Sequence, residues 1–256
     1  MLSFLNIIYV LTIFLFILNC AGTKSRSDIT IEERYNQAMK YFENKKYVRA
    51  QDEFNSVLIL GSGSEYGDDA QYFLGESYFL NKEYILAIAE YEKLTRKMGF
   101  SPFVEKARFK ICEAYRIESP KYYHDQNYTE KALSRYQEFL DDFPNSSHKK
   151  EVLKSIDVLR NKIGQKEFES GILYMKMEEF ESAIMIFDRV DENYYDTEII
   201  HKARLYMIKA CAKNENLSLA KQYLIRFESD LKENNLYNEA VIAINQAEKI
   251  NLKSSK

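Results

Sequence analysis

The chain has 256 residues, of which 46% are hydrophobic and 29% are charged, so it can form a packed core and is not globally disordered. Its 36 basic and 39 acidic residues nearly balance, which argues against a nucleic-acid-binding platform with its usual basic excess. Eight glycines and three prolines are few for this length. Their scarcity favours long helices with short connections over turn-rich β-sandwiches.

The N-terminus has the character of an export signal. Residues 2–18 form a mostly apolar run without a charged side chain, and Cys20 follows close behind it. The end of the run resembles the lipobox of bacterial lipoproteins, although Asn19 stands where a small residue is usual. We expect residues 1–19 to be a lipoprotein signal peptide, Cys20 to carry the lipid, and residues 20–30 to be a linker. An uncleaved membrane anchor and an ordinary cleaved signal are the alternatives.

A short pattern recurs along the rest of the chain: an aromatic residue, an alanine three positions later, and a second aromatic four positions after the alanine. It occurs at Tyr47-Ala50-Phe54, Tyr84-Ala87-Tyr91 and Phe180-Ala183-Phe187, at Ala132-Tyr136 with Thr129 in place of the first aromatic, and more weakly at Ala220-Leu224. An amphipathic segment precedes the first four copies. It carries a small residue twelve positions before the alanine in three of them (Ala38, Gly75 and Gly171), and in the other copy Cys112 stands twenty positions before Ala132. This is the tetratricopeptide pattern of two antiparallel helices per unit of about 34 residues.

The repeats predict an all-α fold, an α-solenoid of about five tetratricopeptide-like helix pairs with a C-terminal capping helix. One pair cannot bury its own apolar face, so neighbouring pairs must stack. The small residues and the alanines should be buried where the two helices of a pair cross. The expected domain is 31–256, with repeats at about 31–64, 68–101, 105–146, 147–195 and 199–232 and a cap at 235–250.

Two irregularities interrupt the repeat spacing. An insertion at 117–126 separates the two helices of the third pair. A proline-free stretch at 148–176 keeps a roughly helical spacing of apolar residues and predicts one long helix in the fourth pair.

The irregularities point to a family. The stretch 30–230 resembles the BamD family, the lipoprotein subunits of the outer-membrane β-barrel assembly machinery. The resemblance is carried by DDAQYFLGESYFLNKEYILAIAEYEKL (68–94), DQNYTEKALSRYQEFLDDFPNSSH (125–148) and LRNKIGQKEFESGILYMKMEEFESAI (159–184).

The resemblance implies a non-catalytic scaffold, lipid-anchored at the periplasmic face of the outer membrane. It implies two protein partners: a BamA-like barrel subunit bound by the C-terminal repeats, and C-terminal segments of unfolded outer-membrane proteins bound by the N-terminal repeats. The alternative is a generic periplasmic tetratricopeptide lipoprotein, such as a pilus or secretin pilot protein.

No catalytic constellation emerges from the sequence. His124, His148 and His201 share no metal-ligand spacing, and we expect them at the surface or in loops. Cys112 and Cys211 lie in apolar helical segments and are expected to be small buried residues rather than nucleophiles. We therefore predict no enzyme activity, no cofactor and no metal site.

The candidate binding residues are aromatic. Tyr35, Tyr72 and Phe109 recur 37 residues apart at one first-helix position, and Phe42 and Phe79 follow about two turns after the first two. These rings either pack the repeats together or line a groove for extended peptides that end in aromatic residues. If they line a groove, they should be accessible to solvent in the free protein.

Overall fold

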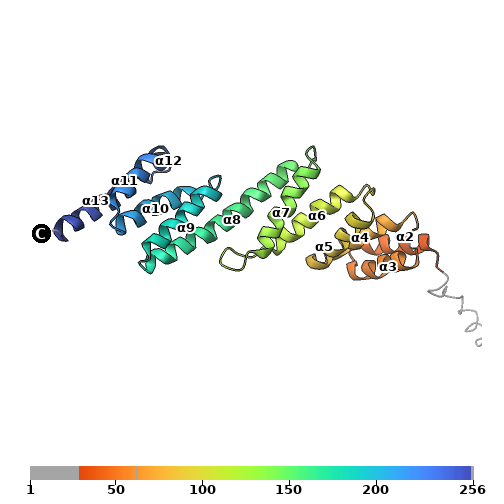
Figure 1. Ribbon diagram of the computed structural model, residues 1–256. Coiled ribbons are helices and arrows are strands. Elements are labelled where there is room, and N and C mark those ends of the chain that lie inside the picture. Colours follow the sequence, from red (N-terminus) through yellow and green to blue (C-terminus); the bar gives the residue numbers. More distant parts are fainter. Residues whose placement is uncertain (1–28, 62, 255–256) are drawn as a thin grey trace, which may run out of the picture. The chain divides into compact units, whose positions relative to one another are not determined.

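The computed structural model describes residues 29–61 and 63–254, and the expected signal peptide, Cys20 and most of the linker lie outside them. The described residues form twelve α-helices and contain no β-strand (Figure 1). The chain divides after Val104 into two compact units, here called the N-terminal unit and the C-terminal unit.

The N-terminal unit contains four helices: α2 (Ile31–Glu43), α3 (Tyr47–Leu60), α4 (Gly67–Leu80) and α5 (Tyr84–Lys97). The C-terminal unit contains α6 (Val104–Glu118, whose first residue closes the N-terminal unit), α7 (Asn127–Asp142), α8 (Lys149–Lys176), α9 (Phe180–Asn193), α10 (Ile200–Lys213), α11 (Leu217–Arg226), α12 (Glu228–Glu233) and α13 (Tyr237–Ser254). The predicted all-α fold of consecutive helix pairs is confirmed, with pairs α2/α3, α4/α5, α6/α7, α8/α9 and α10/α11. The first pair begins at α2, and Thr30 and Glu33 form a capping box at the start of this helix.

The recurring alanines mark the helix crossings, as the sequence predicts. All five, Ala50, Ala87, Ala132, Ala183 and Ala220, are fully buried. The small residues on the first helices face the second aromatic of the pattern. A Cβ atom on Gly75 would lie 2.6 Å from the Tyr91 ring, and one on Gly171 would lie 2.4 Å from the Phe187 ring. In these two pairs the close approach requires glycine, whereas the first and third pairs have Ala38 and Cys112 at the same position.

Five of the helix-to-helix turns share one backbone geometry. In each, a non-glycine residue adopts the left-handed conformation, with φ between 58° and 65°: Lys45, Lys82, Glu178, Glu215 and Asn235. The N–H of the following residue donates to a carbonyl five positions earlier, as from Glu83 to Tyr78 at 2.9 Å. This is the Schellman ending, which satisfies the last carbonyls of the helix and which glycine normally provides.

Lys82→Gly is expected to stabilise the N-terminal unit by about 0.5–1 kcal/mol. The left-handed conformation costs a residue with a Cβ roughly 1–2 kcal/mol, and the extra entropy that glycine loses on folding offsets about half of that. Urea unfolding followed by circular dichroism measures the change. Lys40→Gly, in an ordinary helical conformation, is the control and should instead destabilise by about 1 kcal/mol. Equal losses in both variants would contradict the prediction.

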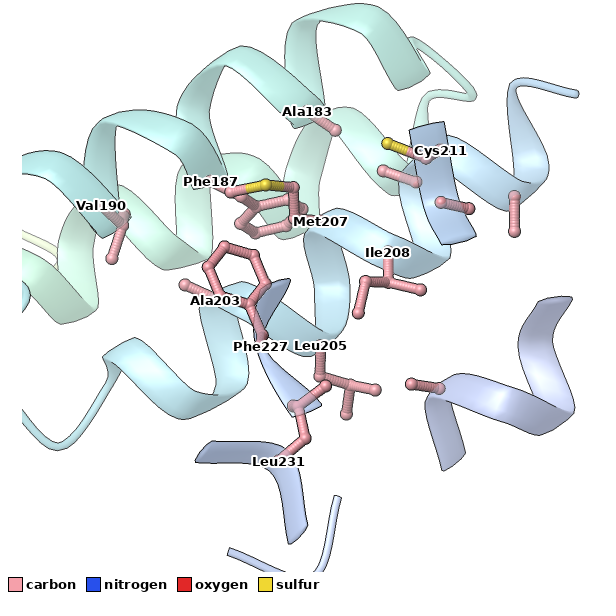
Figure 2. Packing of buried hydrophobic residues seen from close by; sticks show 14 of the residues in the cluster. Ala183, Phe187, Val190, Ala203, Leu205, Met207, Ile208, Cys211, Phe227 and Leu231 are labelled. Atoms are coloured by element: carbon pink, nitrogen blue, oxygen red, sulfur yellow. The ribbon is translucent and has the colours of Figure 1, made fainter. Parts of the chain in front are cut away.

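The predicted long helix is confirmed as α8, which has 28 residues and takes part in two buried clusters of the C-terminal unit. Val152 and Leu159 near its start pack with α6 and α7, and Phe168 near its end packs with α9 and α10. Figure 2 shows side chains of the second cluster, among them Phe187, Met207 and Ile208, gathered between the helices. The same cluster also contains Leu231 of α12 and Ala240 of α13.

The insertion of the third pair is an ordered loop. Helix α6 continues to Glu118, so the loop is shorter than the predicted 117–126. Thr129, which replaces an aromatic residue of the repeat, is fully buried and donates to the side-chain oxygen of Gln126 at 2.7 Å. Lys166 of α8 donates to the carbonyl of His124 at 3.1 Å. The amide nitrogen of buried Gln126 lies within 3.2 Å of three loop carbonyls, those of Lys121, Tyr122 and His124.

The end of the chain departs from a simple cap. A short helix, α12, precedes α13, and the turn between them has the same left-handed geometry as the turns within pairs. Ala240 of α13 is fully buried and stands three residues after Tyr237, as in the repeat pattern. The proposed cap at 235–250 therefore corresponds to the second helix of a pair whose first helix is very short.

Candidate peptide-binding surface

The first-helix rings of the N-terminal unit are each packed between two other rings. The Tyr35 ring centroid lies 6.0 Å from that of Phe54 and 5.0 Å from that of Tyr66. One repeat later, the Tyr72 ring lies 6.0 Å from Tyr91 and stacks on Phe103 at 4.5 Å. Both rings thus contact the second helix of their own pair and the connection that follows that helix.

Phe109 has the same surroundings within the C-terminal unit. Its ring lies 5.9 Å from Phe139 of α7 and stacks on His148 at 4.0 Å. Tyr66, Phe103 and His148, which we call the junction rings, each stand immediately before the next first helix. The sequence analysis missed them, although Tyr66 and Phe103 are also 37 residues apart and the spacing could have revealed the pair.

The expectation of accessible rings is wrong for two of the five candidates. Tyr72 is 8% exposed and Phe109 is 7% exposed, because the junction rings cover their faces. Tyr35, Phe42 and Phe79 are half-buried. The structure therefore brings four candidates into the N-terminal unit as packed or half-packed rings and places the fifth, Phe109, in the C-terminal unit.

Phe42 and Phe79 occupy equivalent places at the ends of the first helices. The Phe42 ring contacts Tyr47 at 5.9 Å and Phe73 at 5.3 Å, and the Phe79 ring contacts Tyr84 at 5.3 Å. Each ring rests on the first aromatic of its own pair's pattern and leaves part of its surface in solvent. Among the candidates, these two rings and Tyr35 keep exposed apolar area that a ligand could cover.

Carboxylates accompany the rings. Burial, together with the charge of the neighbouring Asp69 carboxylate, raises the pKa of Tyr35 to about 12. Burial and the neighbouring Glu76 carboxylate likewise raise the pKa of Tyr72 well above its usual range. Burial and Asp68 raise the pKa of Asp69. This surface offers hydrogen-bond acceptors beside aromatic rings, and it suits backbone N–H groups better than a terminal carboxylate.

A carboxylate at the position after the small crossing residue accompanies a tyrosine on the second helix. Glu76 accepts from the Tyr91 hydroxyl at 2.5 Å, and Glu113 accepts from the Tyr136 hydroxyl in the third pair. The first and fourth pairs have Met39 and Ile172 instead of the carboxylate, and Phe54 and Phe187 instead of the tyrosine. A carboxylate is thus present where a buried hydroxyl needs an acceptor.

Glu76→Met is expected to destabilise the protein by roughly 1–3 kcal/mol, because it removes the acceptor from the buried Tyr91 hydroxyl. Adding Tyr91→Phe should recover at least half of the loss, since the pair then matches Met39 and Phe54 of the first repeat. A double-mutant cycle by urea unfolding measures the coupling. Additive effects of the two substitutions would show that the hydrogen bond does not link these positions.

The histidines and cysteines have structural surroundings. His201 bonds Asp230 at 2.6 Å, and His124 lies in the ordered insertion loop. Cys112 and Cys211 are buried. Burial raises the pKa of the Cys211 thiol to about 11 and that of Cys112 further, so neither is an activated nucleophile. In the described part of the chain, no group of three or more His, Cys, Asp or Glu residues is arranged to hold a metal ion.

The sequence of this chain matches a known protein family. A family model described as YfiO, outer membrane lipoprotein, matches residues 27–210. The chain belongs to the YfiO family. The match runs through the N-terminal unit, the ordered insertion, α8 and most of α10, so the YfiO region includes both irregularities of the repeat array.

Two curated relatives are similar to this YfiO-family chain. The outer membrane protein assembly factor BamD of Rickettsia prowazekii (strain Madrid E) is 26% identical over 187 residues, which are 70% of this chain and 72% of the relative. The protein of the same name from Caulobacter vibrioides is 22% identical over 196 residues, which are 75% of this chain and 64% of the relative. The chain therefore spans slightly less than two thirds of the second relative.

Solved tetratricopeptide structures are also similar. The P58(IPK) TPR domain is 13% identical, with a TM-score of 0.43 over 88% of this chain and 67% of that one. The assignment of a helical repeat fold for this YfiO-family member rests on the pairing within each unit rather than on that likeness. Among the described residues, no helix combines the length and the apolar character that crossing a membrane requires.

Proposed function

We propose that this YfiO-family chain is a non-catalytic assembly factor for outer-membrane β-barrel proteins, acting at the periplasmic face of the outer membrane. The observation that carries the proposal is the family match over 27–210, which spans the insertion and the long helix that a generic tetratricopeptide array lacks. Two relatives named outer membrane protein assembly factor support the same function. The paired helices supply surfaces for protein binding.

We propose a different partner for each end of the repeat array. The C-terminal repeats would bind a BamA-like barrel subunit, and the N-terminal repeats would bind C-terminal segments of unfolded outer-membrane proteins. Affinity purification of the full chain from native membranes tests this function. Recovery of a BamA-like barrel protein is the expected result, whereas recovery of a secretin or pilus component without it would favour a pilot protein.

The proposed membrane attachment is a lipid on Cys20, after removal of residues 1–19. Metabolic labelling with a palmitate analogue should tag the wild-type chain and leave Cys20→Ala untagged and unprocessed. An equally tagged Cys20→Ala variant would contradict lipidation at this residue. The readout is independent of the partner purification, so either proposal can fail alone.

For the substrate segment, the half-buried rings are better candidates than Tyr72 and Phe109. Phe79→Ala is expected to weaken binding of a peptide that ends in aromatic residues by about 5- to 150-fold, the loss from one buried ring contact of roughly 1–3 kcal/mol. Titration of a labelled C-terminal β-strand peptide into the wild-type and variant proteins measures the effect.

The matched control is Val48→Ala, an exposed apolar residue on the second helix of the first pair. It should bind the peptide like the wild type, and circular dichroism should show that both variants are folded. Equal affinities of the wild type and folded Phe79→Ala would assign this ring to packing alone.

A further inference from the structure

One edge of the N-terminal unit gathers the connections between its pairs. Since the helices of each pair are antiparallel, the start of α2, the α3–α4 connection and the chain after α5 lie on the same edge, which we call the anchor edge. A Cβ atom on Gly61 would lie 2.9 Å from the Ile31 side chain, and the Ser101 hydroxyl donates to Asp68 at 2.8 Å. The turns within pairs, at Lys45 and Lys82, lie on the opposite edge.

Three large apolar side chains project from the anchor edge. Phe100 is 106% exposed, as open as in an extended peptide, and Ile59 and Leu60 are 77% and 64% exposed. Arg96 and Lys97 are also exposed beside them, at the end of α5. Aromatic and aliphatic tips next to cationic side chains are typical of surfaces that contact the boundary between lipid headgroups and acyl chains.

The chain that precedes α2 enters the unit at this same edge. The mostly apolar segment 2–18 and Cys20 both lie upstream of Thr30, where α2 is capped. The ten residues from Cys20 to Thr30 reach about 35 Å at most when fully extended. A lipid on Cys20 would therefore keep the anchor edge close to a membrane.

We propose that the anchor edge rests on the membrane surface, with Phe100, Ile59 and Leu60 in the interfacial layer and Arg96 and Lys97 at the lipid phosphates. The inference rests on the proposed attachment through the N-terminal segment. The lipid supplies the attachment, and the contact at the anchor edge would fix how the N-terminal unit is oriented on the membrane surface. Arg96 and Lys97 would attract anionic headgroups at the end of α5, while the exposed carboxylates of Glu32, Glu33 and Glu65 on the same edge oppose this attraction.

The absence of tryptophan from the sequence makes the test direct. The full, lipidated chain carrying Phe100→Trp is reconstituted into vesicles of phosphatidylethanolamine and phosphatidylglycerol, with or without brominated acyl chains. The indole fluorescence should shift to shorter wavelength on vesicle binding, and the brominated lipids should quench it. Leu60→Trp should behave in the same way. Both positions are exposed, so the substitutions leave the core intact.

The matched control is Val48→Trp, 57% exposed and placed near the opposite edge. Its emission should stay that of a solvated indole without quenching. Co-sedimentation with vesicles reports attachment separately for every variant. A chain that sediments while Phe100→Trp and Leu60→Trp stay unquenched keeps its anchor and overturns the contact at the anchor edge. A chain that fails to sediment overturns the anchor and this inference together.

Discussion

Tyr72→Ala is expected to lower the free energy of unfolding by roughly 3–5 kcal/mol, the usual cost of deleting a buried aromatic ring. The ring is 8% exposed and stacks on Phe103 at 4.5 Å, with Phe73 and Tyr91 at its edges. The Glu76 carboxylate also acts on its hydroxyl, so the truncation removes a polar interaction together with the apolar contact. Urea unfolding followed by helical circular dichroism gives the change.

Two variants separate the ring from other effects of the substitution. Tyr72→Phe keeps the ring and removes the hydroxyl, and it should cost only about 0.5–1.5 kcal/mol. Phe100→Ala truncates a fully exposed ring in the same unit and should change stability by less than about 0.5 kcal/mol. If Tyr72→Ala were as mild as Phe100→Ala, the ring would be free for a ligand and the packing described here would be incorrect.

Gly171→Val is expected to destabilise the C-terminal unit by about 3 kcal/mol, the upper part of the range for overpacking. The first added carbon alone would lie 2.4 Å from one Phe187 ring atom and within 2.9 Å of two others. Phe187 is fully buried in the cluster that α8, α9 and α10 share, so its ring has no free space into which to move. The helix propensity that valine gains over glycine recovers only a fraction of this cost.

A second substitution tests the mechanism. Phe187→Ala removes the ring that the valine meets, so the two substitutions together should cost clearly less than the sum of their separate effects. Gly67→Val is the matched control, because no atom lies within 4 Å of a Cβ atom at Gly67. A strictly additive double variant would place the strain somewhere other than the Gly171–Phe187 contact.

The helix pairs could be predicted because the same short sequence pattern recurs in each pair. In the pairs without an insertion, the buried alanine, the small residue twelve positions before it and the aromatic four positions after it meet at one crossing, so their spacing specifies the pair. The long helix α8 could be predicted because its stretch of sequence has no proline and its apolar residues keep a roughly helical spacing. Local periodicity determines these features, and the sequence displays it directly.

The role of the rings could not be predicted in the same way. A period of 37 residues places Tyr35, Tyr72 and Phe109 at equivalent positions, but it does not say what covers them. The cover comes from junction rings in the connections, where no helical period applies. Packing and ligand binding both use an aromatic residue at this position, and only the exposure of each ring distinguishes them.

The insertion shows a further limit. Thr129 looks like a lost aromatic residue in the repeat pattern, yet its buried hydroxyl joins the network in which Gln126 holds the loop. The Ser119 hydroxyl links this network to Lys162 of α8 at 2.6 Å. Hydrogen bonds between residues far apart in sequence produce no periodic sequence pattern. The order of this loop could therefore be recognised only from the structure.

The helix α8 also has a consequence for how the C-terminal unit opens. At 1.5 Å per residue, its 28 residues span about 42 Å, and its two halves supply Leu159 to one cluster and Phe168 to the other. No loop separates these two halves of α8. Unfolding of either cluster therefore disrupts the helix that also supplies residues to the other cluster. Amide hydrogens between these two residues should therefore exchange with solvent only in openings that involve both clusters, as a single cooperative unit.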